Sequence, residues 1–378
     1  MLYKKIMETY FNVILIPAYN PGNELVDYVD KLIESGFHSL IIVNDGSSEQ
    51  YSAVFSELIK HPEVTLLTHA RNQGKGRALK TGFNHYLNIW GNDPFAVGII
   101  TVDSDGQHLL PDVIKISDLL IHEKDANVRS KEGANTLFLG SRKFDYEYVP
   151  FKSKFGNKLT SFIFALLYGK SIQDTQTGLR GIPKEFVPQY LLLPGERFEY
   201  EIHMLIYAVR YHQQIKEVPI QTVYINNNNE THFNPIKDSL KIYKVIFANF
   251  FRYLFSSLSS WIMDIGVFQI FLVLFSSMVS STRILMSTVI ARILSSVFNF
   301  CLNKKIVFRN KGNIISQMVK YYSLVIVQML VSAGMVIFLH NIFRGNELVE
   351  KIIVDTVLFL ISYQIQNIYI FRSDLGDS

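Results

Sequence analysis

The amino-acid sequence changes character near residue 245. Beyond this point it contains four long apolar stretches, joined by short polar loops, at about 253–275, 284–302, 322–340 and 352–371. Each has close to the ~20 residues that a helix needs to cross ~30 Å of hydrocarbon. A buried helical bundle is the alternative, but four such stretches between short polar loops favour membrane spans. We therefore expect an all-α domain of four transmembrane helices over residues 252–373.

Charged residues in the loops predict how these helices cross the membrane. The loop after the second stretch is richer in cations than the loops on either side of it. Its cations are Lys304, Lys305, Arg309 and Lys311. Cytoplasmic loops carry an excess of Lys and Arg, so we expect this loop and both termini in the cytoplasm. The first apolar run, 13–18, is too short for a signal peptide. These features predict an integral protein of the cytoplasmic membrane.

Composition excludes several other classes of protein. Of the 378 residues, 48% are apolar, a high share for a wholly soluble chain. The formal net charge of +4 is small and dispersed, so we expect no nucleic acid partner. The single cysteine, Cys301, excludes an intrachain disulfide framework and a Cys-rich zinc site.

Up to about residue 244, short β-branched runs alternate with segments of helical periodicity. The strand-like runs are 13–16, 40–43, 64–67, 99–102, 136–139 and 218–223. This alternation is typical of an α/β domain with a largely parallel sheet. We expect that domain over residues 1–235, followed by an amphipathic connector, 236–251, that leads into the membrane.

Two acidic residues follow the fourth strand at alternate positions, in Asp103-Ser104-Asp105-Gly106-Gln107. Alternate side chains of an extended segment point the same way, so Asp103, Asp105 and Gln107 can present oxygens to one ion. Mg²⁺ or Mn²⁺ prefers such ligands and completes its shell with water and phosphate oxygens. Taken alone, the motif is more often a solvated Asp-Gly turn that closes a strand.

Two other strand ends and one helix start carry groups that suit a nucleotide. The first strand ends in 17–20 and the second in Asp45, at the edge where open α/β sheets bind ligands. An aspartate there can accept a hydrogen bond from an N–H of uracil or guanine. Gly74 and Lys75 precede a helix expected at 77–86, and glycines at a helix N-terminus let backbone N–H groups approach an anion. The spacing of a P-loop is absent.

Together these motifs resemble those of the family 2 glycosyltransferases with the GT-A fold. Within that family they are most similar to the dolichyl-phosphate mannose synthase-like branch, which glycosylates polyprenyl phosphates. The resemblance covers about residues 10 to 235, on segments 16–20, 43–47, 72–78, 103–108, 140–142, 173–181 and 197–201. The apolar domain, through 251–254 and 299–304, resembles the GtrA-like membrane domain. Two departures are visible: Pro21-Gly22 follows Asn20 where many relatives have an acidic pair, and Asn44 replaces a frequent aspartate.

The resemblance implies a role for each matching residue. Asp45 would hold the base, and the other contacts to the nucleotide sugar would come from Pro17, Ala18, Tyr19, Asn20, Gly74, Lys75, Ser104 and Asp105. Asp103, Asp105 and Gln107 would bind the Mg²⁺ or Mn²⁺ that neutralises the departing diphosphate. Arg142 and Arg180 would bind the lipid phosphate, although a surface salt bridge is the alternative for both. Asp174 would orient or line the sugar and acceptor pocket. The implied catalytic set is Asp103, Asp105, Arg142, Asp174 and Arg180.

The implied activity is transfer of one sugar from a nucleotide sugar to undecaprenyl or another polyprenyl phosphate, for cell-envelope glycan modification. The donor would be of the UDP-glucose, UDP-N-acetylglucosamine or GDP-mannose type. A lipid phosphate is already an anion, so it needs no general base, and single displacement inverts the anomeric centre. One alternative is a transporter or scaffold for lipid-linked sugar with a regulatory soluble domain. Another is a processive polysaccharide synthase, which the absence of a Gln-x-x-Arg-Trp motif around Trp90 and Trp261 disfavours.

Four further expectations complete the interpretation. A helix at about 155–170 is expected either at the membrane interface, among membrane lipids, or in the core. Asp264 and Arg292 lie within predicted spans, where charges are costly, and are expected to face the bundle or a polar cavity. Pairing of the two is one hypothesis, and helix packing alone is the alternative. Glu199 and Glu201 are expected to be structural or acceptor-loop carboxylates rather than a catalytic pair. We also expect a homo-oligomer.

Overall fold

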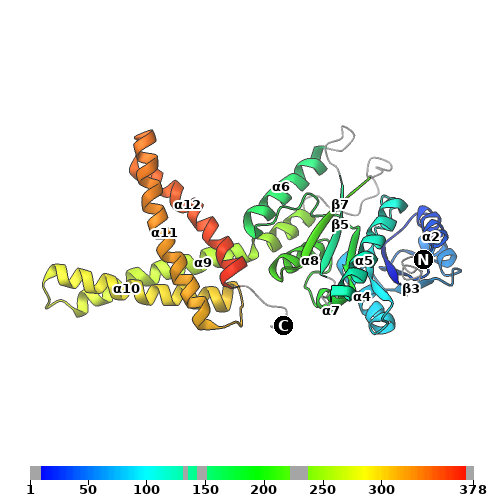
Figure 1. Cartoon of the computed structure of the whole chain (residues 1–378), viewed down its shortest axis with the longest axis horizontal. Helices are drawn as coiled ribbons and strands as arrows, with labels where there is room; N and C mark the ends of the chain where they lie inside the picture. The colour runs from blue at the N-terminus through cyan, green and yellow to red at the C-terminus, as the bar shows by residue number, and fades with distance from the viewer. Residues whose placement is uncertain (1–9, 131–134, 143–150, 222–236, 372–378) are drawn as a thin grey trace. The chain divides into compact units, whose positions relative to one another are not determined.

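The computed structural model describes residues 10–130, 135–142, 151–221 and 237–371 (Figure 1). Both termini, the end of the strand expected at 218–223 and the start of the connector at 236 lie outside the described residues. The chain forms two compact units, Met1–Phe162 with Ser171–Tyr243 and Ile163–Lys170 with Lys244–Ser378. Helices α6 (Phe151–Tyr168) and α9 (Lys237–Leu274) each contribute to both units.

The first unit is built on a seven-stranded sheet with the order β3-β2-β1-β4-β6-β5-β7. Its strands are β1 (Phe11–Ala18), β2 (Leu40–Asn44), β3 (Val64–Thr68), β4 (Ala96–Thr101), β5 (Thr136–Arg142), β6 (Arg180–Pro183) and β7 (Gln214–Ile220). All neighbours pair in parallel except β6, which runs antiparallel to β4 and β5. The predicted α/β class with a mostly parallel sheet is confirmed.

Strand β6 is the one strand of this sheet that the sequence pattern did not predict. Its four residues include glycine and proline, which are depleted in strands, and it has no apolar alternation. Pairing with its neighbours forms it, and Thr101 at the end of β4 lies opposite Arg180 at its start. The predicted phosphate-binding arginine is therefore part of the sheet.

Helices cover both faces of the sheet. They are α2 (Glu24–Glu34), α3 (Ser52–Leu58), α4 (Lys75–Trp90), α5 (Leu110–Ser130), α7 (Val187–Leu191) and α8 (Glu199–Arg210), with short 3₁₀ turns at Glu49–Tyr51 and Lys184–Phe186. Successive residues of β1 point to opposite faces, so Ile14 and Ile16 join the core with α2 and α5. Leu15 points the other way and lies against Gly82 of α4, where a Cβ would come within 2.2 Å. Helix α4 thereby packs tightly onto the central strand.

The second unit is helical. Besides α9 it contains α10 (Ser280–Leu302), α11 (Ile314–Phe343) and α12 (Glu347–Ile365), with π-helical turns at Asn303–Val307 and Gln366–Ile370. Among the described residues, three helices are long and apolar enough to span a membrane: Lys237–Leu274, Ser280–Val307 and Ile314–Phe343. Helix α12 is shorter and begins with charged residues, so the fourth span stays a prediction. The residues expected to form a separate connector are the first turns of α9, which continues without a break into the first apolar stretch.

Candidate active site

The predicted nucleotide-binding residues gather at one edge of the sheet. Because β1 lies between β2 and β4 and is parallel to both, their carboxyl ends meet there. Pro17 and Ala18 end β1, and the half-buried Tyr19 follows. Asn20 adopts a left-handed conformation, with φ of 50°. Its N–H donates to Ser47 Oγ at 2.8 Å, and its Oδ1 accepts from the N–H of Ser48 at 3.0 Å. Asn20 thus ties the loop after β1 to the loop after β2.

Asp45 is buried, and both oxygens of its carboxylate contact other residues of the protein. Its Oδ1 lies 2.7 Å from His69 Nδ1 and accepts the N–H of Gln73 at 2.9 Å. Its Oδ2 accepts from the N–H of Gly74 at 2.7 Å and from Asn72 Nδ2 at 3.0 Å. A carboxylate has about four lone-pair directions, so these four contacts use its capacity. These contacts make Asp45 shape the loop before α4, and its contact with a base stays a prediction.

The first turn of α4 also forms hydrogen bonds with another segment of the protein, the one that precedes α8. The N–H of Arg77 donates to the carbonyl of Glu196 at 3.0 Å. Gly74 has a φ of 105°, and a Cβ there would lie 2.5 Å from the same carbonyl oxygen. The Glu196 carboxylate accepts from Lys80 Nζ at 2.9 Å and from Arg77 Nη2 at 2.8 Å. The backbone N–H groups of Gly74 and Arg77, at the predicted anion site, therefore bind protein acceptors, and the segment before α8 covers this helix end.

The side chain of Lys75 lies between two carboxylates. Its Nζ is 2.7 Å from Oδ1 of Asp103 and 2.9 Å from Oε1 of Glu201. Burial alone would lower the pKa of Lys75, but these two carboxylates outweigh it and raise the pKa above its usual value. Burial likewise opposes ionisation of Asp103, but Lys75 and His108 hold its pKa well below the usual range. Lys75, Asp103 and Glu201 therefore form a salt-bridge cluster, in which both shifts favour the charged forms of Lys75 and Asp103.

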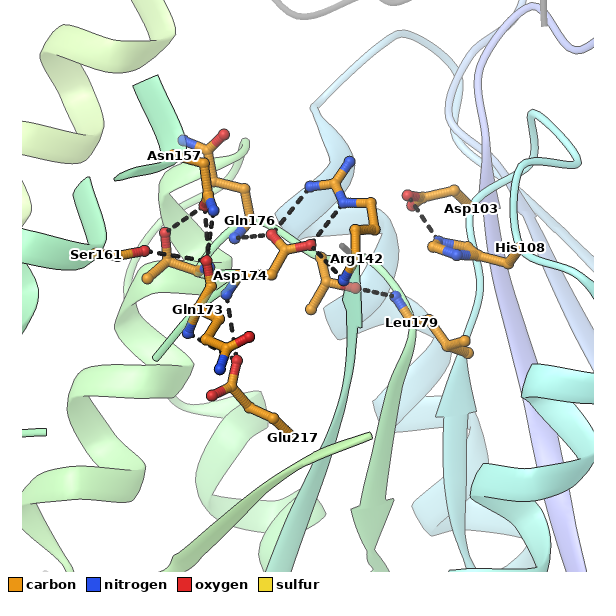
Figure 2. Close-up of polar contacts among 12 residues, drawn as sticks. Asp103, His108, Arg142, Asn157, Ser161, Gln173, Asp174, Gln176, Leu179 and Glu217 are labelled. Carbon is orange, nitrogen blue, oxygen red and sulfur yellow. Dashed lines mark hydrogen bonds and ion pairs between the residues drawn. The ribbon is translucent and has the colours of Figure 1, made fainter. Parts of the chain in front are cut away.

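Asp103 is confined on its other side as well. Its Oδ2 lies 3.3 Å from His108 Nε2, as Figure 2 shows. A Cβ at Gly178 would come within 2.2 Å of the same oxygen, so a larger residue there would displace the Asp103 carboxylate. The carbonyl of Gly178 accepts a 2.7 Å hydrogen bond from Thr101 Oγ1 at the end of β4. Asp103 is thus held at a defined position beside the sheet.

Asp105 occupies the exposed side of the same loop, with Ser104 and Gln107 half-buried beside it. Its Oδ1 accepts the N–H of Gln107 at 3.1 Å. Partial desolvation of the carboxyl group and repulsion from Asp103 raise the pKa of Asp105. Among the described residues no group of three or more His, Cys, Asp or Glu side chains could hold a metal ion. Two carboxylates and an amide with an excess of negative charge nevertheless fit Mg²⁺ or Mn²⁺ that takes its other ligands from water and phosphates.

Arg142, at the end of β5, is held by a buried carboxylate. Its Nε donates to Asp174 Oδ2 at 2.6 Å and its Nη2 to Oδ1 at 3.0 Å (Figure 2). The Asp174 side chain is fully buried, whereas that of Arg142 is 23% exposed. The N–H of Gln176 also donates to Asp174, at 3.2 Å. This pair is no surface salt bridge, because Asp174 is fully buried and orients Arg142 through two hydrogen bonds.

Arg180 does not match its predicted role. It is 1% exposed, and its guanidinium donates to the carbonyls of Thr177 and Glu201, both at 2.9 Å. Its Nη2 is buried without a hydrogen-bond partner among the described residues. A lipid phosphate cannot reach a group inside the sheet and its covering helix. Because β6 buries Arg180, the structure does not place this residue where the predicted contact with the lipid phosphate requires it.

Three residues that shape this site were not predicted to do so from the sequence. Glu201 was assigned only a structural or acceptor-loop role, and Gly178 and His69 were not singled out. Gly178 lies inside the 173–181 run that carried the family resemblance, so its position was a usable signal. His69 and Glu201 have no local pattern that links them to Asp45 and Lys75, since each contact joins segments far apart in the chain.

The second unit contains an ion pair between two of its apolar helices. Arg292 Nη2 lies 3.7 Å from Asp264 Oδ2, and Ser295 Oγ donates to Asp264 Oδ1 at 2.9 Å. The predicted pairing of Asp264 with Arg292 is confirmed, but the Arg292 side chain is 73% exposed and so does not face the interior of the bundle. In α6, Phe164 and Tyr168 are buried, and Tyr168 donates to the carbonyl of Ile246 at 3.0 Å. The exposed Phe162 shows that α6 also keeps an apolar outer face.

A groove of about 710 Å³ runs between α11 and α12, with Tyr253 of α9 in its wall. Its lining is largely apolar, but it includes polar side chains of both helices. Ser332 Oγ donates to Asp355 Oδ1 at 2.7 Å, and Lys351 Nζ lies 2.8 Å from Asp355 Oδ2. Charged groups inside apolar helices are costly, so an ion pair in an otherwise apolar groove sets this part of the helical unit apart.

Two family descriptions match the chain, each over one of its parts. Residues 13–164 match Glycosyl transferase family 2, and residues 239–371 match the GtrA/DPMS transmembrane domain. The chain is 28% identical over 242 residues to an uncharacterized protein of Methanocaldococcus jannaschii, covering 63% of this chain and 92% of that protein. It is 29% identical over 228 residues to the UDP-N-acetylglucosamine--dolichyl-phosphate N-acetylglucosaminyltransferase of Methanococcus voltae, covering 56% and 85%. It is 26% identical over 234 residues to the dolichyl-phosphate beta-glucosyltransferase of Saccharomyces cerevisiae, covering 56% and 67%.

Proposed function

The chain belongs to glycosyl transferase family 2 and carries a GtrA/DPMS transmembrane domain, and we propose that it transfers one sugar from a nucleotide sugar to a polyprenyl phosphate. We propose undecaprenyl phosphate as the acceptor and a UDP-sugar or GDP-sugar as the donor. The names of the relatives from Methanococcus voltae and Saccharomyces cerevisiae support a lipid-phosphate acceptor. One observation carries the proposal: the acidic pair Asp103 and Asp105 shares a unit with Arg142, an arginine oriented by a buried carboxylate. A cation site for a diphosphate and a fixed guanidinium for a phosphate are what this reaction needs.

On the donor side, Asp103, Asp105 and the Gln107 amide would hold Mg²⁺ or Mn²⁺ against the diphosphate. When bound, such an ion acts as a Lewis acid that neutralises charge on the leaving group. Asn20 and Asp45 would act indirectly, because each fixes a loop at the edge where the nucleotide would lie. Tyr19, beside Asn20, and the Ser104 segment would supply the remaining contacts.

On the acceptor side, Arg142 would bind the lipid phosphate, with its orientation set by Asp174. An oxygen of that phosphate attacks the anomeric carbon as the bond from this carbon to the diphosphate oxygen breaks. The acceptor is already ionised at neutral pH, so no general base is required. Attack opposite the leaving group inverts the anomeric centre.

The membrane part of the proposal follows from the apolar helices. We propose four spans, with α12 as the fourth, and a cytoplasmic catalytic domain, because cations concentrate between α10 and α11. The proposed division is a catalytic domain at 1–235, a juxtamembrane segment at 236–251 and a membrane domain at 252–373. A homo-oligomer is part of the same proposal. This arrangement would keep the site near the lipid acceptor.

A second candidate function is retention or transport of the lipid-linked sugar by the membrane domain. The Lys351–Asp355 pair in the groove between α11 and α12 favours it, because charges within spanning helices often mark substrate pathways. In proteoliposomes, this candidate predicts product accessible on the side opposite the catalytic domain, and less of it with Lys351→Met. Product confined to the catalytic side in both proteins would exclude transport.

The test of the main proposal uses purified full-length protein, undecaprenyl phosphate, Mg²⁺ or Mn²⁺ and a panel of nucleotide sugars. Mass spectrometry should detect a lipid phosphate carrying one sugar with at least one donor. Asp105→Ala should abolish this product, and Asp27→Ala, at an exposed position of α2, should not. A ladder of longer products would instead indicate a processive synthase. No lipid product from any donor, with Asp105→Ala and the parent protein alike, would refute the proposal.

A further inference from the structure

Lys75 bridges two carboxylates that come from distant parts of the chain. Asp103 follows β4, whereas Glu201 lies in the first turn of α8. The exposed fractions are 16% for the Lys75 side chain, 29% for Asp103 and 6% for Glu201. Asp103 is therefore the member of this cluster that a ligand reaches most easily, and Glu201 is the hidden one.

The surrounding chain holds all three side chains in place. Arg180 donates to the carbonyl of Glu201 and so anchors the first turn of α8. Gly178 and His108 confine Asp103, as described above. Lys75 itself begins α4, whose neighbouring glycines pack against the 196–200 segment. The two carboxylates cannot separate without disturbing these contacts, so both stay within reach of the Lys75 ammonium.

The charges of the cluster suit a divalent cation. Lys75 offsets one of the three carboxylates Asp103, Asp105 and Glu201, and these four side chains together carry two net negative charges. One divalent cation at Asp103 and Asp105 would balance them. Lys75 nevertheless covers Oδ1 of Asp103, an oxygen that such a cation would use. Cation binding therefore requires Lys75 to withdraw from Asp103, and Glu201 is already 2.9 Å away to receive it.

We infer that Lys75 is the resident counter-ion of Asp103, and that Glu201 is a positioning residue that retains Lys75 when a divalent cation binds Asp103 and Asp105. This inference deepens the proposed function and rests on its metal site. It replaces the expected contact of Lys75 with the donor phosphate. It also gives the buried Arg180 a function, which is to hold the turn that carries Glu201.

The inference predicts opposite effects for two substitutions in one cluster. Removing the ammonium in Lys75→Met uncovers Asp103 and adds net negative charge, so Mn²⁺ should bind roughly tenfold more tightly. Removing the carboxylate in Glu201→Gln leaves Lys75 on Asp103 alone, so Mn²⁺ should bind roughly tenfold more weakly. The double variant restores the original net charge and should return to within about threefold of the parent protein.

The experiment measures Mn²⁺ binding to the full-length protein without nucleotide, from the free-ion signal in electron paramagnetic resonance. Glu196→Gln is the matched control, because Glu196 also binds cations of α4, Arg77 and Lys80, but does not touch Asp103. It should leave Mn²⁺ affinity unchanged. Lys75→Gln serves as a second variant if Lys75→Met does not fold, as judged by circular dichroism.

Mn²⁺ affinity that falls or stays the same in the folded Lys75 variants would overturn the inference. Affinity lost equally in Glu201→Gln and Glu196→Gln would overturn the role of Glu201, since both would then act through general packing. The predicted order of Mn²⁺ affinities without any lipid-linked product would refute the proposed function and leave the inference standing. Lipid-linked product from a protein whose Mn²⁺ affinity is the same with and without Lys75 would refute the inference and leave the proposed function standing.

Discussion

The guanidinium of Arg142 donates two hydrogen bonds to the carboxylate of Asp174, from Nε to Oδ2 at 2.6 Å and from Nη2 to Oδ1 at 3.0 Å. Paired bonds of this kind fix the plane of the guanidinium as well as its position. Asp174 is fully buried while Arg142 reaches solvent. The fold therefore presents one arginine in a fixed orientation at the end of β5.

This relationship predicts that the free energy of unfolding falls by different amounts when Arg142 or Asp174 is replaced. Arg142→Met leaves a buried carboxylate without its counter-charge, so the free energy of unfolding should fall by about 3 kcal/mol. Asp174→Asn leaves a partly exposed arginine that water can solvate, so the loss should be smaller. Urea unfolding of both variants in detergent checks this order. A greater loss in Asp174→Asn would contradict this order and would mean that the hydrogen bond from the N–H of Gln176 to Asp174 contributes more than the pair with Arg142.

Substitution of the two predicted phosphate-binding arginines, Arg142 and Arg180, should affect the KM for the lipid phosphate differently. Arg142→Met should raise the KM for the lipid phosphate by at least roughly tenfold, since a charge-assisted phosphate contact contributes about 1.5–3 kcal/mol. Arg180→Met should leave this KM unchanged, because Arg180 is buried and contacts backbone carbonyls. Initial rates at varied lipid concentration measure both. A raised lipid KM in the folded Arg180→Met protein would restore the original prediction for this residue.

Asp45→Asn should act through the loop before α4. The amide offers one acceptor fewer and sets N–H groups against N–H groups of Gly74 or Gln73, at a cost of about 1–3 kcal/mol of stability. The KM for the nucleotide sugar should rise by a similar factor for UDP-linked and GDP-linked donors. If Asp45 contacted the base directly, the ratio between the two donors would change. Competition by free UDP and GDP measures that ratio.

Asp105→Asn should stabilise the metal-free protein while removing its response to metal. The raised pKa of Asp105 means that the folded chain binds this proton more tightly than the unfolded chain. The carboxyl group therefore opposes folding at neutral pH and ceases to do so as the pH falls through the raised pKa. The variant should gain up to about 2 °C in Tm at pH 7 without metal, since Asp105 is exposed to solvent. Mn²⁺ should raise the Tm of the parent protein alone.

The same shift predicts how metal binding depends on pH. Protons and Mn²⁺ compete for Asp105, so Mn²⁺ affinity should decline at a higher pH than for an ordinary aspartate. The pKa of Asp103 is held low by Lys75 and His108, so Asp103 should stay ionised over that range. Mn²⁺ titrations between pH 4 and pH 7 follow the effect. An affinity that is constant over this range would contradict it.

Most of the sheet could be predicted because its strands are buried on both faces. Strands β1, β2 and β4 are runs of β-branched and aliphatic residues whose side chains are almost all inaccessible, and such runs are recognisable without tertiary information. Strand β6 could not be predicted, since four residues with glycine and proline form a strand only through their neighbours. Its discovery corrected the role of Arg180.

The site was predictable in its location and less so in its partners. The D-x-D motif and the strand ends follow from local sequence, and they lie at one sheet edge as expected. The partners of Asp45 and Lys75 come from residues 24 to 126 positions further along the chain, and no local pattern encodes such pairs. The pairing of Asp264 with Arg292 was predictable because few charges occur in the apolar helices and each needs a partner.

The central claim is transfer of a single sugar to a lipid phosphate at the Asp103–Asp105 site. The most direct measurement is the mass of the lipid product formed from undecaprenyl phosphate by the full-length protein with Mn²⁺ and each nucleotide sugar. The account predicts the mass of the lipid phosphate plus one sugar residue, absent with Asp105→Ala and present with Asp27→Ala. A lipid of unchanged mass with every donor, from folded protein that binds Mn²⁺, would contradict it.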